Sequence, residues 1–331
     1  MRNNKTSQTR KAAQNDFDSL KLARNLGMAT VAGSATLSMA AFGAAKYVVE
    51  QLTKPQPLNS MDNFTFSPFE LQLEFELVRF PTADGSLLEG WLLPRPDDQR
   101  VVISVSGYRG RKEDMLGISS YLWRKGYNVL LFDYRGYGAR RSKSDILTLG
   151  HRELEDYQAA LRFVRSRFDQ PLIGAVGGSM GAAVSLVAAA RDEGILAVWS
   201  DSAFANQREV IATAWKTTTH LPDWPVVDLA ERLFEERTGY SWREFSPVKE
   251  IARIAPRPVF LIHAANDSIA PVSDAYALYK AAAGPKELWI EDGLEHCGVY
   301  FNSREEYCRR ALAFFEQYLV PAEVDHLAKA G

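Results

Sequence analysis

The sequence predicts an α/β domain with a mostly parallel central sheet, helices on both faces and a short helical insertion, preceded by one apolar helix. Three observations support this prediction. Short apolar runs alternate with amphipathic segments from residue 69 to residue 320. Most of these runs are continuous and rich in β-branched residues, which is typical of strands buried on both faces. A stretch of 20 uncharged residues precedes them. Strands that alternate with helices in this way form parallel sheets with crossover helices.

The composition excludes several other classes of protein. A chain of 331 residues, of which 46% are hydrophobic, can bury a substantial core. The 39 Lys and Arg residues oppose 41 Asp and Glu residues, so the chain lacks the basic field that nucleic-acid binding needs. The two cysteines, Cys297 and Cys308, are too few for a disulfide framework or a four-thiolate zinc site. Two unreactive thiols are the simpler interpretation, and one disulfide between them stays open.

The first 68 residues are predicted to lie outside this domain. Residues 1–25 form a polar, cationic leader, and residues 26–45 contain no charged side chain. A helix of that length spans about 30 Å of hydrocarbon. We therefore predict a transmembrane signal anchor over residues 26–49, with the N-terminus in the cytoplasm and the domain outside it. A cleaved signal peptide and a soluble amphipathic or buried helix are the alternatives. Residues 50–68, which include Pro55 and Pro57, are the predicted linker.

The predicted domain begins with an antiparallel hairpin. Leu71, Leu73, Phe75 and Leu77 alternate with polar residues, a pattern that predicts a half-buried strand. After a turn at Asp84-Gly85, residues 86–93 are its predicted partner. Six continuous strands follow, at residues 101–105, 129–132, 172–176, 195–199, 259–262 and 287–290.

Helices are predicted between these strands by their apolar periodicity. They cover residues 114–125, 152–168, 180–191, 274–283 and 304–319. Residues 204–245 break the alternation, and they carry Trp215, Trp224 and Trp242 together with two prolines. We predict that this region is an inserted helical cap. The domain then ends at residue 320, and residues 321–331 are a tail.

The most informative motif is Gly177-Gly178-Ser179-Met180-Gly181, which lies between a predicted strand and a predicted helix. A serine at such a sharp turn takes a strained backbone conformation, and the flanking glycines avoid clashes. The hydroxyl then lies at a helix N-terminus, which favours developing negative charge. The motif predicts Ser179 as a nucleophile. The alternative is a glycine-rich turn that only packs the helix closely.

A serine hydroxyl needs a base, and the base must be held by an acid. Of the five histidines, His296 lies in a loop beyond the last predicted strand and is the predicted base. Asp267 follows the strand at 259–262 and is the predicted acid, with Asp292 and Asp201 as competitors. His263 ends a buried strand and is predicted to be a core residue. His151 begins a helix, His220 lies in the cap and His326 lies in the tail.

Acyl transfer also needs donors for the oxyanion of the tetrahedral intermediate. One predicted donor is the backbone N–H of Met180, directly after the nucleophile. The other is the backbone N–H of Tyr108, in the Ser106-Gly107-Tyr108-Arg109-Gly110 turn after the strand at 101–105. The residues show no cluster with metal-ligand spacing and no nucleotide-binding motif, so neither a metal nor another cofactor is expected.

With these motifs, residues 71–319 resemble an α/β-hydrolase, in particular the Bem46-like and peptidase-S9-like serine hydrolases. Ser179 in its turn carries the resemblance, together with the segments Asp133-Tyr134-Arg135-Gly136-Tyr137-Gly138 and Pro256-Arg257-Pro258. The order Ser179, Asp267, His296 along the chain is also the order of the α/β-hydrolase triad. Relatives usually carry His-Gly where this chain has Ser106-Gly107. Because the oxyanion donor at this turn is a backbone N–H, Ser106 does not remove it. The departure affects the side-chain contacts that support the turn.

The resemblance implies a serine hydrolase that cleaves an ester or related acyl bond through an acyl-enzyme intermediate, as a carboxylesterase does. A peptidase or thioesterase with the same triad and a non-catalytic binding protein of the same fold are the alternatives. The expected partners are a small-molecule or lipid-like acyl substrate and a lipid bilayer, without nucleic acid. The oligomeric state stays open. Arg135 and the Arg140-Arg141 pair are expected to hold the loop after their strand, with binding of an acidic substrate as the alternative.

Overall fold

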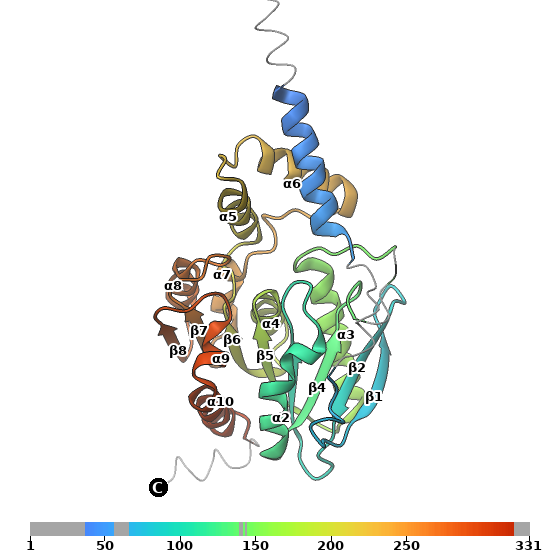
Figure 1. Ribbon diagram of the computed structural model, residues 1–331. Helices are drawn as coiled ribbons and strands as arrows, with labels where there is room; N and C mark the ends of the chain where they lie inside the picture. The colour runs from blue at the N-terminus through green and yellow to red at the C-terminus, as the bar shows by residue number, and fades with distance from the viewer. Residues whose placement is uncertain (1–36, 56–65, 139–141, 143, 321–331) are drawn as a thin grey trace, which may run out of the picture.

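The computed structural model describes residues 37–55, 66–138, 142 and 144–320. They build an eight-stranded sheet in the order β1-β2-β4-β3-β5-β6-β7-β8, with helices on both faces (Figure 1). β1 pairs with β2 and β2 with β4 in antiparallel fashion, and the other five pairs are parallel. The predicted mostly parallel α/β architecture is therefore confirmed.

Each continuous apolar run of the sequence forms a strand at or near its predicted position. The strands are β1 (Glu76–Pro81), β2 (Leu87–Leu93), β3 (Arg100–Val105), β4 (Asn128–Asp133), β5 (Leu172–Gly178), β6 (Ile195–Asp201), β7 (Val259–Ala264) and β8 (Lys286–Glu291). The first strand is the exception, because residues 71–75 precede β1 and are not part of it. The predicted inward face was also wrong, since Val78 and Phe80 are buried whereas Leu77 is 54% exposed.

The five predicted helices are present within a few residues of their predicted ends. They are α2 (Leu116–Arg124), α3 (His151–Arg167), α4 (Met180–Arg191), α8 (Val272–Ala281) and α10 (Arg304–Tyr318). The predicted insertion at 204–245 contains α5 (Gln207–Thr219) and α6 (Val226–Thr238). Among the described residues, four short helices had no sequence prediction of their own: η2 (Lys112–Met115), α7 (Pro247–Glu250), η3 (Ile251–Ile254) and α9 (Gly298–Asn302).

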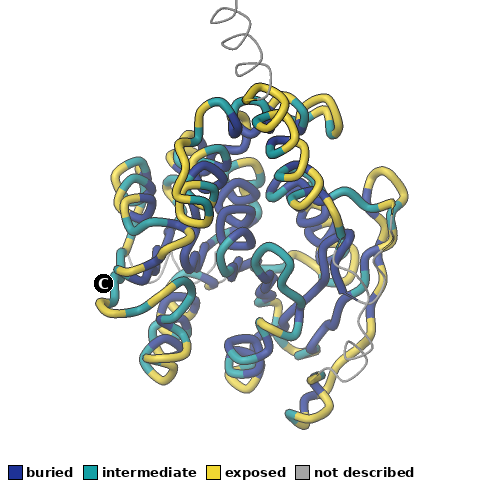
Figure 2. The backbone as a smooth tube through the Cα atoms, turned by 45° about the horizontal axis from the view of Figure 1, so that its top comes forward, coloured by how far each residue is buried: buried dark blue, intermediate teal, exposed yellow. Residues whose placement is uncertain are grey.

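Alternating side chains of the central strands build a separate core on each face of the sheet. Val101 and Ile103 of β3 belong to the core cluster that includes residues of α3, α4 and α8, whereas Val102 belongs to the second cluster, with residues of α2 and α10. In Figure 2 these buried strands occupy the centre of the molecule, and the exposed positions lie on the outer helices, the loops and the edge strand β1. The sheet thus fixes the ends of its strands, where the loops with the candidate site residues begin.

A helix over residues 37–53 lies with α5 and α6 at one end of the sheet (Figure 1). Ala45 and Val49 on this helix are buried in the larger core cluster. The helix continues past residue 49, so residues 50–53 do not belong to a linker. No helix among the described residues is both long and apolar enough to span a bilayer. Residues 1–36, which include residues 26–36 of the predicted anchor, lie outside the described residues, as do 56–65, Arg140, Arg141 and the tail from 321.

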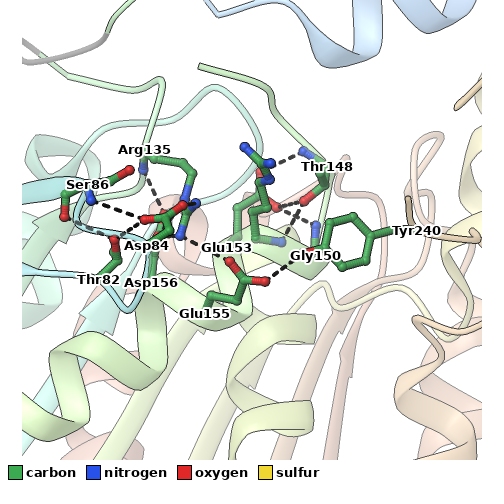
Figure 3. Close-up of polar contacts among 11 residues, drawn as sticks. Thr82, Asp84, Ser86, Arg135, Thr148, Gly150, Glu153, Glu155, Asp156 and Tyr240 are labelled. Atoms are coloured by element: carbon green, nitrogen blue, oxygen red, sulfur yellow. Dashed lines mark hydrogen bonds and ion pairs between the residues drawn. The ribbon is translucent and has the colours of Figure 1, made fainter. Parts of the chain in front are cut away.

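Ion pairs of the buried Arg135 side chain anchor the loop after β4 (Figure 3). The Arg135 side chain is 3% exposed, and its guanidinium pairs with Asp84, Glu155 and Asp156. Asp156 Oδ2 also accepts a hydrogen bond from the Arg135 backbone N–H, at 2.8 Å. Arg135 therefore joins the β1–β2 hairpin to α3, as expected of a residue that holds its loop. With its donors occupied by these carboxylates, Arg135 is not placed to bind an acidic substrate.

Replacement of Arg135 by Met is expected to lower the free energy of unfolding by ~3–5 kcal/mol, because the Asp156 carboxylate stays buried without its cation. Arg167→Met is the matched control. Arg167 pairs with Glu76 at 3.0 Å, but both side chains are about half exposed, so its loss should cost less than ~1 kcal/mol. Urea unfolding of the two variants measures the difference. Equal costs would show that the Arg135 network does not stabilise the fold.

Candidate active site

Ser179 occupies the tight turn between β5 and α4. Its backbone has φ 55° and ψ −121°, a conformation that non-glycine residues rarely adopt. The Ser179 N–H donates to the Asp201 carbonyl of β6 at 2.8 Å, which holds the strained residue against the neighbouring strand. The turn presents the hydroxyl at the N-terminus of α4. This is the local geometry that the glycine-serine motif predicts.

The two outer glycines of the motif lie where no side chain fits. A Cβ on Gly177 would lie 2.5 Å from the Ala182 nitrogen, and a Cβ on Gly181 would lie 2.5 Å from the Val105 carbonyl oxygen. A Cβ on Gly178 would meet only Met115 Sδ, at 3.9 Å. The glycines at the first and last positions are thus required by close backbone approach, whereas Gly178 is not.

The three predicted triad residues lie in one hydrogen-bonded row. His296 Nε2 is 2.8 Å from Ser179 Oγ, and His296 Nδ1 is 2.6 Å from Asp267 Oδ2. A carboxylate only accepts hydrogen bonds, so Nδ1 carries the proton and Nε2 accepts from the serine hydroxyl. The serine comes from the β5–α4 turn, the aspartate from the loop after β7 and the histidine from the loop after β8. β5, β7 and β8 run parallel in one sheet, with β6 between β5 and β7. The loops that follow them therefore meet at the same edge of the sheet.

Asp267 is held more firmly than either competing acid. Its side chain is fully buried, and Oδ1 accepts hydrogen bonds from the backbone N–H groups of Ile269 and Ala270, both at 2.9 Å. Asp292 is exposed in the loop before His296. Asp201 is buried at the end of β6, where desolvation raises its pKa to about 6 and Ser202 Oγ donates to its carboxyl at 2.9 Å. Of the three, Asp267 is the one in contact with His296.

The other described histidines lie away from Ser179. His263 is 1% exposed and its Nε2 donates to the Ala270 carbonyl at 2.7 Å, so it is a core residue as predicted. His151 stacks on Tyr240 with ring centroids 4.7 Å apart. His220 ends α5 in the left-handed conformation. His326 lies outside the described residues.

The predicted oxyanion turn lies directly against the nucleophile. A Cβ on Gly107 would be 2.9 Å from the Cβ of Ser179, so only glycine allows this approach. Met180 is the first residue of α4, so its backbone N–H lies at the helix N-terminus, as expected of an oxyanion donor. The Tyr108 side chain points toward the helix over residues 37–53, where its hydroxyl donates to the Leu52 carbonyl at 2.8 Å. This hydrogen bond connects the turn to that helix. This link had no signal in the sequence, since the partners are 56 residues apart.

Both cysteines are free thiols, so the predicted alternative of a disulfide between them is wrong. Cys297 follows His296, and burial raises the pKa of its thiol far above the usual range. Burial also raises the pKa of Cys308, to about 11. Protonated thiols are poor nucleophiles, so neither cysteine competes with Ser179.

A cavity of about 580 Å³ opens over Ser179 and His296. Residues of the predicted oxyanion turn line it, together with Tyr300, Phe301 and Tyr307. A cavity of this volume is in the range of small-molecule sites. No group of three or more His, Cys, Asp or Glu side chains in the described part of the chain is arranged to hold a metal ion.

Comparison with known proteins places this site in a family. Residues 116–321 match the prolyl oligopeptidase family. The protein YqkD of Bacillus subtilis (strain 168) is 29% identical over 270 residues, 81% of this chain and 87% of the relative. The esterase Pf2001 of Pyrococcus furiosus has a TM-score of 0.65 and 23% identity, over 81% of this chain and 100% of the esterase. The acylaminoacyl peptidase of Pyrococcus horikoshii has a TM-score of 0.55 and 21% identity, over 75% of this chain and 42% of the peptidase.

The two solved structures share the fold of this chain. The family match identifies the family, because it covers more than half of the chain. The matched residues include the Ser179 turn and the loops of Asp267 and His296. The predicted resemblance to peptidase-S9-like α/β-hydrolases is confirmed. The chain belongs to the prolyl oligopeptidase family and has the α/β-hydrolase fold.

Proposed function

We propose that the protein is a serine hydrolase that cleaves an ester or related acyl bond. The observation that carries the proposal is the hydrogen-bonded row of Asp267, His296 and Ser179 at a strained turn beneath a cavity. A buried acid, an oriented imidazole and a serine hydroxyl in this order are the parts that activate a serine nucleophile.

In the proposed reaction, Ser179 Oγ attacks the carbonyl carbon of the substrate while His296 Nε2 takes the hydroxyl proton. Asp267 stays ionised, accepts the Nδ1–H and stabilises the imidazolium. The N–H groups of Tyr108 and Met180 stabilise the oxyanion of the tetrahedral intermediate. His296 then donates its proton to the leaving oxygen, and the acyl group remains on Ser179. Water, deprotonated by His296, attacks the acyl-enzyme and releases the acid and the free serine.

An ester is the first choice of substrate, because the esterase Pf2001 is covered over its whole length whereas the acylaminoacyl peptidase is covered over less than half. The same triad would serve a peptidase or a thioesterase, which differ in the leaving group. Parallel assays with p-nitrophenyl esters, peptide p-nitroanilides and acyl thioesters separate these three activities.

Ser179→Ala is expected to abolish labelling by a fluorophosphonate probe and to lower ester turnover by several orders of magnitude, because no other hydroxyl is activated by His296. Cys297→Ala is the matched control, since it removes a neighbouring nucleophilic atom and should retain labelling. Gel-based probe labelling of the folded proteins gives the answer. Full labelling of Ser179→Ala would refute the nucleophile.

Asp267→Asn is expected to lower kcat by a factor of about 10⁴, because an amide partner favours the wrong tautomer of His296. Asp292→Asn is the matched control, and at an exposed position it should change kcat only modestly. Steady-state kinetics on one ester compares the two. The opposite ranking would assign the acid to Asp292.

We also propose that the N-terminal segment holds the protein at a membrane, with the hydrolase domain outside the cytoplasm. The support is the uncharged run at 26–45 and the cationic leader before it. Ala41, Ala44, Ala45 and Val49 pack on the core of the domain, so the proposed span ends before Ala41.

If this is correct, the full-length protein should sediment with membranes and resist carbonate extraction. Protease added outside intact cells should reach the domain. Full-length protein in the soluble fraction without detergent would exclude the anchor. A membrane-bound domain that is protected from protease would reverse only its orientation.

A further inference from the structure

We propose that the helix over residues 37–53 is a specificity-determining wall of the active site, which together with α5 encloses an apolar pocket for the acyl chain of the substrate. The inference rests on the proposed function, because it assigns the acyl group of the same reaction. It adds that a segment preceding the hydrolase domain selects the substrate.

The pocket lies between the helix over residues 37–53 and α5, and it has a volume of about 360 Å³. Val48 and Leu52 line it on one side, and Ile211, Ala214 and Trp215 line it on the other. Ser179 is also among its lining residues, as is Tyr108. The same two residues line the 580 Å³ cavity over the triad. The two cavities therefore meet at the proposed nucleophile.

The two cavities differ in chemistry. None of the described residues that line the pocket between the helices is charged. The cavity over the triad is lined by Glu113, Asp114 and Asp201 in addition to its aromatic residues. An acyl chain gains most from burial in the uncharged pocket. A polar leaving group fits the other cavity, where its hydrogen-bonding groups find partners.

The volume of the pocket indicates the length of the acyl chain. An apolar protein cavity of about 150 Å³ binds the six carbons of benzene. By this measure, 360 Å³ accommodates an apolar group of up to about 14 carbons. Each methylene that enters should strengthen binding about fourfold. The expected substrates are thus medium-chain to long-chain acyl esters, with short-chain esters leaving part of the pocket empty.

Hydrogen bonds to the last carbonyl groups of the helix over residues 37–53 fix it to the domain. These carbonyl groups lack partners within the helix itself. Tyr108 Oη donates to the Leu52 carbonyl at 2.8 Å, and the Arg109 guanidinium donates to the Gln51 carbonyl. The Leu147 N–H donates to the Thr53 carbonyl at 3.0 Å. Two of these donors belong to the predicted oxyanion turn. The wall of the pocket and the turn are therefore fixed to each other, so a displaced helix would disturb both.

The test measures kcat/KM of the full-length protein on p-nitrophenyl esters from acetate to hexadecanoate. For the wild type, kcat/KM should rise with chain length up to about 14 carbons and fall beyond it. Val48→Trp fills the pocket from the N-terminal helix, so it should lower kcat/KM for octanoate and decanoate at least tenfold and leave acetate within twofold. Lys46→Trp is the matched control. Lys46 is exposed on the same helix and lines neither cavity, so this variant should keep the wild-type profile.

Tyr47→Ala keeps the inference testable if Val48→Trp does not fold. Tyr47 lines the pocket but is 63% exposed, so its loss should leave the fold intact. We expect KM for octanoate to rise severalfold while the acetate parameters stay unchanged.

Two results would overturn the inference in different ways. In the first, the wild type hydrolyses esters, but the folded variants keep its chain-length profile. The helix would then not line the acyl site, and the proposed function would stand. A wild type without esterase activity and without fluorophosphonate labelling would refute the proposed function and the inference together.

Discussion

The close approach of three backbone segments around Ser179 is the constraint on which the site depends. The turn from β5 into α4, the end of β3 and the Ser106–Gly110 turn pack so tightly that Gly107, Gly177 and Gly181 leave no room for a Cβ. This packing forces Ser179 into a positive φ and places its hydroxyl at a helix N-terminus. The large two-faced core supplies the stability against which such strain is held. A looser arrangement of the same residues would leave the hydroxyl without its imidazole partner.

Much of the fold and of the candidate site was predictable, for a physical reason. Central strands are buried on both faces, so β3 to β7 appear in the sequence as continuous apolar runs. Loops at the carboxyl ends of parallel strands converge, so a serine, an acid and a histidine after β5, β7 and β8 come together. The predicted start of the first strand was wrong because Leu73 is buried but lies before β1. Its apolar side chain extends the alternating pattern of the sequence beyond the strand itself. α9 was missed because a helix of five residues has too few positions to show a period.

The N-terminal helix was the least predictable part. Its uncharged stretch satisfies a length criterion for a membrane span, yet Ala45 and Val49 contact the core. Small apolar residues suit close packing on a protein surface as well as in a bilayer, so composition alone does not separate the two environments. The decisive contacts are the hydrogen bonds of Tyr108 and Leu147 to the end of the helix. Such bonds to backbone carbonyls leave no pattern in the sequence of the partner.

His263 lies beside the same carboxylate oxygen that contacts His296, with Nε2 3.4 Å from Asp267 Oδ2. Its proton is engaged by the Ala270 carbonyl, and burial lowers its pKa. A lowered pKa keeps this imidazole neutral to a more acidic pH than a solvent-exposed histidine. Asp267 therefore faces His296, the proposed base, and a second imidazole that resists protonation. In a mildly acidic medium, His263 places no cation behind the acid of the proposed triad.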